Sequence, residues 1–174
     1  MQELLIITPV KDSINHTIRT MEAVVQSELT VPHRYVVYND NSTPENTARL
    51  HTEAARLGVE VVDLATLTDH PSPNYLFVLR RCRKEALATD AGLLIVESDV
   101  TVQRDTLQKL YEGATARTDC GIAAAVTVDE EGKINYPYLY ARGKEGKDYD
   151  CKKHCSFCCS LLTPALLKAC DFDR

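Results

Sequence analysis

The sequence lacks the marks of several protein classes. No apolar run is long enough to cross a bilayer, and the apolar segment Leu4-Leu5-Ile6-Ile7 has only the length of a strand. The amino terminus has no basic flank followed by a long apolar core, so no secretory signal is visible. The net charge is −5, and no basic cluster is dense enough to indicate nucleic-acid binding. We therefore expect a cytoplasmic protein that does not bind nucleic acid.

Internal repeats, low-complexity tracts and Gly/Ser linkers are also missing. The 174 residues, 44% of them apolar, predict a single globular domain spanning residues 1–174. Seven cysteines are present, five of them after residue 150, and in a reducing compartment they are expected to be thiols.

Apolar runs alternate with stretches of helical periodicity, which is typical of a parallel α/β sheet. The pattern predicts a three-layer α/β/α sandwich with a mostly parallel central sheet. Strands are expected at residues 3–8, 35–38, 59–62, 93–96, 120–128 and 156–162, and helices at 12–27, 43–58, 75–89 and 103–117. Residues 134–140 are expected to return as a strand with Tyr136, Tyr138 and Tyr140 on one face.

Several residues mark the helix boundaries. Thr43 is a typical N-cap, and Pro44 suits the first helical position, where its missing N–H costs nothing. Gly58 ends that helix, Gly92 is expected to end the next one, and Pro164 is expected to open a short last helix.

Polar side chains follow three of the predicted strands. Thr8 and Pro9 end the first, Asp40 follows the second, and Glu97 and Asp99 follow the apolar run at 93–96. Ligands of open α/β sheets bind at these carboxyl ends. If the chain stays extended, Glu97 and Asp99 point to the same side, and their repulsion favours a divalent cation with oxygen ligands, Mg²⁺ or Mn²⁺.

Two interpretations of these acids remain open. Glu97 and Asp99 could belong to a solvated loop or a helix cap, and Asn39-Asp40-Asn41-Ser42 could be only an Asx turn. In the functional interpretation, the Asp40 carboxylate accepts a hydrogen bond from an N–H group on a nucleobase edge.

Four segments in order resemble glycosyltransferase family 2, whose members have the GT-A fold, a Rossmann-like α/β architecture. They are Ile6-Ile7-Thr8-Pro9-Val10, Val37-Tyr38-Asn39-Asp40-Asn41-Ser42-Thr43, Arg80-Arg81-Cys82-Arg83 and Ile95-Val96-Glu97-Ser98-Asp99. The stretch from Ser160 to Asp173 resembles the part of the family that finishes in a Gly-Phe-Asp-like turn.

The resemblance implies a role for each matching residue. Asp40 would contact the base, most simply uracil, while Thr8 and Pro9 would line the nucleoside pocket. Arg81 would lie near the base or the phosphates, and Glu97 would contact the ribose or a metal-bound water. Asp99 would coordinate the metal that bridges the diphosphate.

The implied reaction moves a sugar from a nucleoside-diphosphate sugar to a hydroxyl acceptor such as a glycan, with inversion. The metal would stabilise charge on the leaving diphosphate, and a general base would deprotonate the acceptor. In the family this base lies beyond the Gly-Phe-Asp-like turn, so no residue up to Arg174 is assigned to it. We therefore expect that the chain is truncated before the catalytic base and that its acceptor-binding part is incomplete. Peripheral association of the full-length protein with a membrane is also compatible with the resemblance.

Three departures from the family pattern are visible. Asn39 replaces the first acid of the second segment, Cys82 stands where asparagine is frequent, and Glu97 replaces the first aspartate of the Asp-x-Asp motif. Because no catalytic base is assigned, a non-catalytic nucleotide-sugar-binding domain is an alternative. A nucleotidyltransferase-like enzyme is disfavoured because the Gly-Gly turn expected after its first strand is missing.

The spacing Cys151-x3-Cys155-x2-Cys158 is also that of radical enzymes that hold a four-iron cluster. A zinc site formed by Cys151, His154, Cys155 and either Cys158 or Cys159 is a further alternative. The simplest interpretation is that Cys158, Cys159 and Cys170 are small buried residues of a strand and a helix.

Overall fold

A computed structural model describes residues 1–144, 146–151 and 154–172 of the chain. Its centre is a six-stranded sheet in the order β3-β2-β1-β4-β6-β5. The strands are β1 (Leu4–Val10), β2 (His33–Asn39), β3 (Glu60–Asp63), β4 (Gly92–Val96), β5 (Ile122–Ala124) and β6 (Cys159–Leu162). Strands β1 to β4 pair in parallel, while β6 is antiparallel to both β4 and β5. The predicted, mostly parallel sheet is confirmed.

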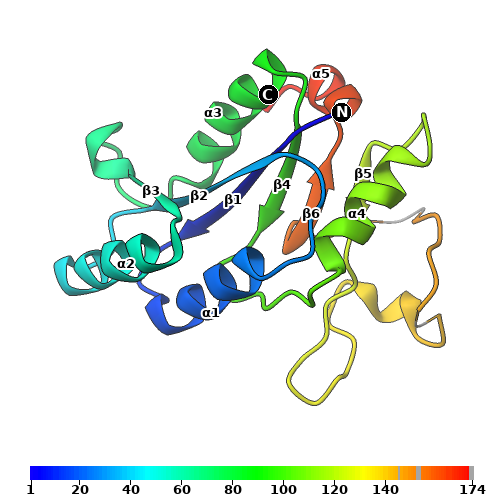
Figure 1. Cartoon of the computed structure of the whole chain (residues 1–174), viewed down its shortest axis with the longest axis horizontal. Helices are drawn as coiled ribbons and strands as arrows, with labels where there is room; N and C mark the ends of the chain where they lie inside the picture. Colours follow the sequence, from blue (N-terminus) through cyan, green and yellow to red (C-terminus); the bar gives the residue numbers. More distant parts are fainter. Residues whose placement is uncertain (145, 152–153, 173–174) are drawn as a thin grey trace.

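Helices cover both faces of this sheet (Figure 1). Helices α1 (Ile14–Val25), α2 (Pro44–Leu57) and α4 (Thr106–Thr115) pack on one face. Helices α3 (Tyr75–Ala88) and α5 (Pro164–Ala169) pack on the other, and the short 3-10 helices are η1 (Leu64–Thr66) and η2 (Tyr138–Ala141). The architecture is the predicted three-layer α/β/α sandwich.

The core follows from alternation along the central strands. On β1, Leu4 and Ile6 face α1 and α4, whereas Leu5 and Ile7 face α3. Strand β4 is buried along its whole length, because helices cover both of its faces and strands flank both of its edges. The chain therefore leaves β4 toward the rim of a rigid sheet, where Glu97 and Asp99 follow.

The predicted ends of α2 are confirmed. The Thr43 hydroxyl accepts a hydrogen bond from the Asn46 N–H, Pro44 is the first helical residue, and Gly58 is left-handed with φ 70°. A residue without a Cβ is favoured in that conformation.

Two predictions of local structure are wrong, one at Gly92 and one at residues 134–140. Gly92 does not end α3 but begins β4, and the chain turns before it at Asp90, whose φ is 53°. A Cβ at Gly92 would lie 2.3 Å from the Met1 Sδ and 2.9 Å from methyl carbons of Leu4 and Leu161, so close packing explains this glycine.

Residues 134–140 do not form the expected strand. One isolated bridge joins Val128 to Ile134, after which the chain enters η2. Pro137 has no N–H to donate to a ladder, and the Tyr138 N–H turns back to the Asn135 carbonyl. Tyr136 is 79% exposed while Tyr138 is buried, so the predicted tyrosine face does not exist.

Candidate functional site

The sequence-predicted acids lie along one edge of the sheet. Strands β1, β2 and β4 are parallel, so their carboxyl ends meet at the same edge, toward which the β1 and β4 arrowheads point in Figure 1. The Asp40 N–H donates to the Val10 carbonyl at 2.8 Å, which places Asp40 beside the end of β1. Strand β1 lies between β2 and β4. The backbone at Asp40 and the backbone at Glu97 are therefore two strand spacings apart, which is about 10 Å.

Asp40 is 8% exposed, and its carboxylate is held by a neighbouring loop. Its Oδ2 accepts hydrogen bonds from the Ser72 hydroxyl and the Asn74 N–H, and its Oδ1 accepts one from the Asn74 side-chain amide, each at 2.7 Å. Burial alone would raise the pKa of Asp40, but these donors, with the charge of Lys11, hold that pKa below its usual value. Asp40 is therefore an anion whose Oδ1 keeps one lone pair free of described donors.

The segment after β4 is a turn rather than the extended chain expected from the sequence. Ser98 and Asp99 form this turn, and the Val100 N–H donates to the Glu97 carbonyl at 3.1 Å. The Glu97 N–H donates to the Cys158 carbonyl, which ties the turn to the start of β6. The prediction that an extended backbone aims both acids to one side is therefore wrong, although the acids still interact.

That interaction appears in the pKa of Glu97. Burial raises this pKa, and the negative charge of Asp99 raises it further. Glu97 is half-buried and Asp99 is exposed, so the pair presents two carboxylates of unequal depth at the rim. A divalent cation would relieve their repulsion.

The donor chemistry fits a hard cation held partly by a ligand. Carboxylate oxygens suit Mg²⁺ and Mn²⁺, which are commonly bound by one or two carboxylates together with substrate phosphates. In the described part of the chain, no group of three or more His, Cys, Asp or Glu side chains converges to hold a metal. Asp99 and Glu97 are the two carboxylates at this edge that could serve as ligands of such a cation.

The first residues of α3 connect the two acidic positions. Asn74, the N-cap residue, is bonded to Asp40, and the next residue, Tyr75, lies near Glu97, whose charge contributes to raising the pKa of Tyr75 after burial. The hydrogen bonds of Asn74 place Asp40 at the start of α3, and the charge of Glu97 acts on the next residue. Sequence reasoning missed Ser72, Asn74 and Tyr75, because no local pattern indicates that the chain around the start of α3 contacts Asp40.

Thr8 and Pro9 lie between these positions. Thr8 is fully buried, and its hydroxyl is 2.9 Å from the Tyr35 hydroxyl on the helix α1 side of the sheet. Pro9 is half-buried beside Tyr38 of β2. Strand β4 pairs with β1 only as far as Ile7, so the missing N–H of Pro9 does not interrupt that pairing.

The arginines of α3 lie away from this edge. Arg81 is exposed, and its position seven residues after Asn74 corresponds to about 10 Å along the helix. Its charge contributes to the lowered pKa of Glu60 at the start of β3, after the larger effect of Arg34. The structure does not bring Arg81 to the carboxylates. Arg80 and Arg83 donate to the carbonyls of Phe172 and Leu167 and hold the α5 region.

Lys11 is a cation that the sequence analysis did not consider. It is exposed, directly follows β1 and lies close enough to Asp40 and Asp12 to lower the pKa of both. No ion pair of Lys11 is found among the described residues. A cation at the end of the central strand suits an anionic ligand.

The cysteines give no metal cluster within the described residues. Cys159 is buried as expected, and burial raises its pKa to about 12. Cys158 and Cys170 are only partly buried, which corrects the prediction for those two. Cys151 is exposed, with its Sγ 2.9 Å from the Tyr140 hydroxyl. Lys152, Lys153 and the predicted turn residue Asp173 lie outside the described residues.

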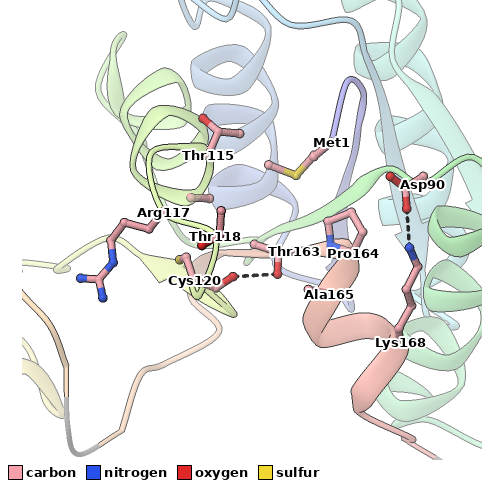
Figure 2. Close-up of a pocket in the computed structure, with 11 residues that line it drawn as sticks. Met1, Asp90, Thr115, Arg117, Thr118, Cys120, Thr163, Pro164, Ala165 and Lys168 are labelled. Atoms are coloured by element: carbon pink, nitrogen blue, oxygen red, sulfur yellow. Dashed lines mark hydrogen bonds and ion pairs between the residues drawn. The ribbon is translucent and has the colours of Figure 1, made fainter.

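A pocket of about 510 Å³ lies at the opposite edge of the sheet (Figure 2). It is lined by residues at the amino ends of β1, β4 and β5, including Met1, Asp90 and Cys120, and by the start of α5. Its polar groups largely satisfy one another: Lys168 pairs with Asp90 at 2.7 Å, and the Thr163 hydroxyl donates to the Cys120 carbonyl at 3.0 Å. This pocket is separate from the acidic edge.

No family model and no curated protein sequence matches the chain. Solved structures do resemble it. A mannosyltransferase, PcManGT from Pyrobaculum calidifontis, solved with GDP-Man and Mn²⁺, aligns with TM-score 0.54 and 16% identity over 72% of this chain and 35% of its own. S. aureus TarS 1-349, solved with UDP-GlcNAc, aligns with TM-score 0.51 and 17% identity over 66% of this chain and 31% of its own.

Glucosyl-3-phosphoglycerate synthase from Mycobacterium tuberculosis, solved with UDP, aligns with TM-score 0.51 and 16% identity, over 70% of this chain and 43% of its own. The chain thus spans between about a third and less than half of each of these proteins. None of the helices in the described residues is long and apolar enough to span a membrane. The likeness establishes the fold: the chain has the GT-A architecture seen in nucleotide-sugar glycosyltransferases.

Proposed function

We propose that this chain is the nucleotide-sugar-binding part of a metal-dependent glycosyltransferase. The supporting observation is that Asp40 and Glu97 follow parallel strands at the same edge of the sheet, where Asn74 at the start of α3 donates two hydrogen bonds to Asp40. A nucleotide lying along this edge would meet Asp40 at one end and Asp99 at the other. The roughly 10 Å between the strands that carry them suits a ligand as long as a nucleoside diphosphate.

In this proposal Asp40 recognises the base. An anionic carboxylate is a strong acceptor for a base N–H, and Oδ1 retains a lone pair for it after the bond from Asn74. Uracil, with one N–H between two carbonyl groups, fits a single acceptor. Thr8 and Pro9 would support the nucleoside from β1, whereas Arg81, about 10 Å along α3 from Asn74, lies away from it.

The phosphates would lie toward Asp99. A bound Mn²⁺ or Mg²⁺ would stabilise negative charge on the leaving diphosphate. Asp99 and Glu97 would supply oxygen ligands or hydrogen-bond acceptors there. Lys11, whose charge reaches Asp40 and Asp12, would add positive charge near the anionic ligand. The acceptor would be a hydroxyl group, for example of a glycan, with inversion at the sugar; its general base is not assigned to a described residue.

Cytoplasmic location and association of a longer protein with a membrane surface belong to the same proposal. The alternative, a domain that binds a nucleotide sugar without transferring it, shares every contact described here. A transfer or hydrolysis assay distinguishes the two.

Calorimetric titration of the chain with UDP, with and without Mn²⁺, tests the proposal. We expect saturable binding of UDP that Mn²⁺ strengthens at least tenfold. GDP serves as the base control and should bind more weakly. Absence of any nucleoside diphosphate binding in the presence of Mn²⁺ or Mg²⁺ would refute the proposal, whereas binding without slow hydrolysis of labelled UDP-sugars would favour the non-catalytic alternative.

A further inference from the structure

The segment between β5 and β6 carries a cluster of aromatic rings. Ring centroids lie 6.1 to 6.3 Å apart in pairs that together link Tyr136, Tyr138, Tyr140, Tyr149 and His154. These separations are typical of interacting aromatic rings. The proposed contacts with the nucleotide and the metal use none of these side chains, so the aromatic cluster calls for an explanation of its own.

The inner rings of the aromatic cluster are held in place. Tyr138 is buried, and its hydroxyl accepts a hydrogen bond from the Ser156 N–H at 2.9 Å. The Tyr140 hydroxyl donates to the His154 carbonyl at 2.9 Å, and the rings of Tyr140 and Tyr149 are perpendicular. A ring surface that is already ordered loses little conformational entropy when a ligand binds to it.

Tyr136 and His154 form the outer face of the aromatic cluster. Tyr136 is 79% exposed, and His154 is exposed as well. Their ring centroids are 6.1 Å apart with the planes inclined by 40°, and the His154 ring also packs nearly perpendicular to that of Tyr140. Among the described residues, neither the Tyr136 hydroxyl nor the His154 ring makes a hydrogen bond. The pair therefore offers two ring surfaces together with polar groups that a ligand can bond.

This outer face lies close to the acidic edge of the sheet. The Glu97 N–H donates to the Cys158 carbonyl at 2.8 Å, and His154 precedes Cys158 by only four residues, which span at most about 14 Å. In Figure 1, η2 lies below β5 and β6, toward the end of the sheet at which β4 finishes. A molecule that rests on Tyr136 and His154 is therefore within reach of a sugar held beside Glu97.

The chemistry of this outer face suits a sugar ring. The faces of a sugar ring carry C–H groups that pack on aromatic rings, and its rim carries hydroxyl groups that bond a phenol or an imidazole nitrogen. Lys144, a cation at the aromatic cluster, already lies 4.5 Å from the centroid of the Tyr149 ring. The surface therefore favours an uncharged glycan over a ligand that carries phosphate.

We propose that Tyr136 and His154 bind the acceptor, with a sugar ring of a neutral glycan stacked on their exposed faces. This inference rests on the proposed function, and it adds the class of the acceptor and the residues that hold it. Tyr136 and His154 contribute binding and orientation only, and neither transfers a proton.

Saturation-transfer difference NMR of the chain with neutral disaccharides tests this assignment. The probes are maltose, cellobiose, lactose and N,N′-diacetylchitobiose, each titrated alone and with UDP and Mn²⁺. We expect a saturable response from at least one of them. With that disaccharide, Tyr136→Ser and His154→Ala should each weaken binding about fivefold, because each variant removes one ring surface. Tyr136→Phe keeps the ring and should recover most of the affinity that Tyr136→Ser loses.

Val128→Ser is the matched control for this titration. It removes another exposed apolar side chain from the segment between β5 and β6 and should leave disaccharide affinity unchanged. The Tm of Tyr136→Ser should stay within about 1 °C of the wild-type value, because a substitution at an exposed position usually changes stability little. A loss of binding at unchanged Tm then reports on the ring and not on folding.

Several results would overturn the assignment of Tyr136 and His154. They are no response from any disaccharide with or without UDP and Mn²⁺, equal affinity in Tyr136→Ser and wild type, an equal loss in Val128→Ser, and displacement of the disaccharide by UDP. If UDP binds and no disaccharide does, this inference fails while the proposed function stands. If a disaccharide binds and no nucleoside diphosphate does, the proposed function fails, and the acceptor role fails with it.

Discussion

Asn74 holds Asp40 at both carboxylate oxygens: its backbone N–H donates to Oδ2 and its side-chain amide to Oδ1, each at 2.7 Å. The same residue occupies the N-cap position of α3, so the start of that helix is fastened to the end of β2. Asp40 therefore has a structural role whatever its ligand. Any nucleobase must share this carboxylate with the loop that carries Ser72 and Asn74.

Asp40→Asn should destabilise the chain by about 2 kcal/mol at neutral pH, because an amide offers one acceptor where three donors converge. It should also weaken UDP binding without removing the effect of Mn²⁺. Urea unfolding and calorimetry measure the two effects separately. Unchanged stability would show that the Ser72 and Asn74 contacts contribute little.

The stability difference between wild type and Asp40→Asn should depend on pH. The pKa of Asp40 in the folded chain lies below the usual 3.8, so its stabilising contribution is complete above the unfolded-state pKa. The contribution is lost as the pH falls through the folded-state pKa. Urea unfolding of both proteins between neutral pH and pH 3 should therefore show the difference shrinking in acid; a difference that grows in acid would contradict the assignment.

Asp99→Asn should abolish the strengthening of UDP binding by Mn²⁺. The Tm of the variant should stay within about 1 °C of the wild-type value. The side chain is exposed at a turn, where a substitution usually changes stability little. Glu130→Gln removes an exposed acid from another turn and is the matched control. Retained Mn²⁺ dependence in Asp99→Asn would remove Asp99 from the metal site.

Two glycine substitutions test the packing. Gly92→Ala should cost about 1–3 kcal/mol, since its Cβ would meet Met1, Leu4 and Leu161 at 2.3–2.9 Å. Gly113→Ala, inside α4 with nothing within 4 Å of the added Cβ, should stabilise the chain by up to about 1 kcal/mol. Chemical denaturation of both variants gives the comparison, and equal effects would contradict the packing described for β4.

The thiols should differ in reactivity. Cys151 is exposed, whereas burial raises the pKa of Cys82 to about 11 and of Cys159 to about 12. Iodoacetamide at neutral pH should label Cys151 quickly, and Cys82 and Cys159 only after unfolding, as peptide mass spectrometry can show. Rapid labelling of Cys159 in the folded chain would contradict the position of β6.

The sequence was sufficient for the sheet and for the edge that carries the acids. The apolar run at 93–96 predicted a strand, and Thr43, Pro44 and Gly58 predicted the ends of α2; both expectations are confirmed. These features are local, because periodicity and helix-end chemistry are readable from neighbouring residues. The position of Asp40, Glu97 and Asp99 at one edge followed from parallel topology.

Contacts between distant segments were not predictable in this way. The bonds from Ser72 and Asn74 to Asp40 cross more than thirty positions, and no local pattern indicates them. Gly92 looked like a helix end because its close neighbours, Met1 and Leu161, lie far away in sequence. Residues 134–140 do not form the predicted strand because Pro137 has no N–H for a ladder, and the alternation of the tyrosines does not compensate for it.

The central claim is that Asp40 and Asp99 hold opposite parts of one nucleotide. A crystal structure of the chain with UDP and Mn²⁺, with the metal located by its anomalous signal, tests it most directly. We predict Mn²⁺ against Asp99, the diphosphate bridging from it past β1, and the uracil N–H directed at the Asp40 Oδ1. A metal bound elsewhere, or a nucleotide that touches only one of the two carboxylates, would contradict the account.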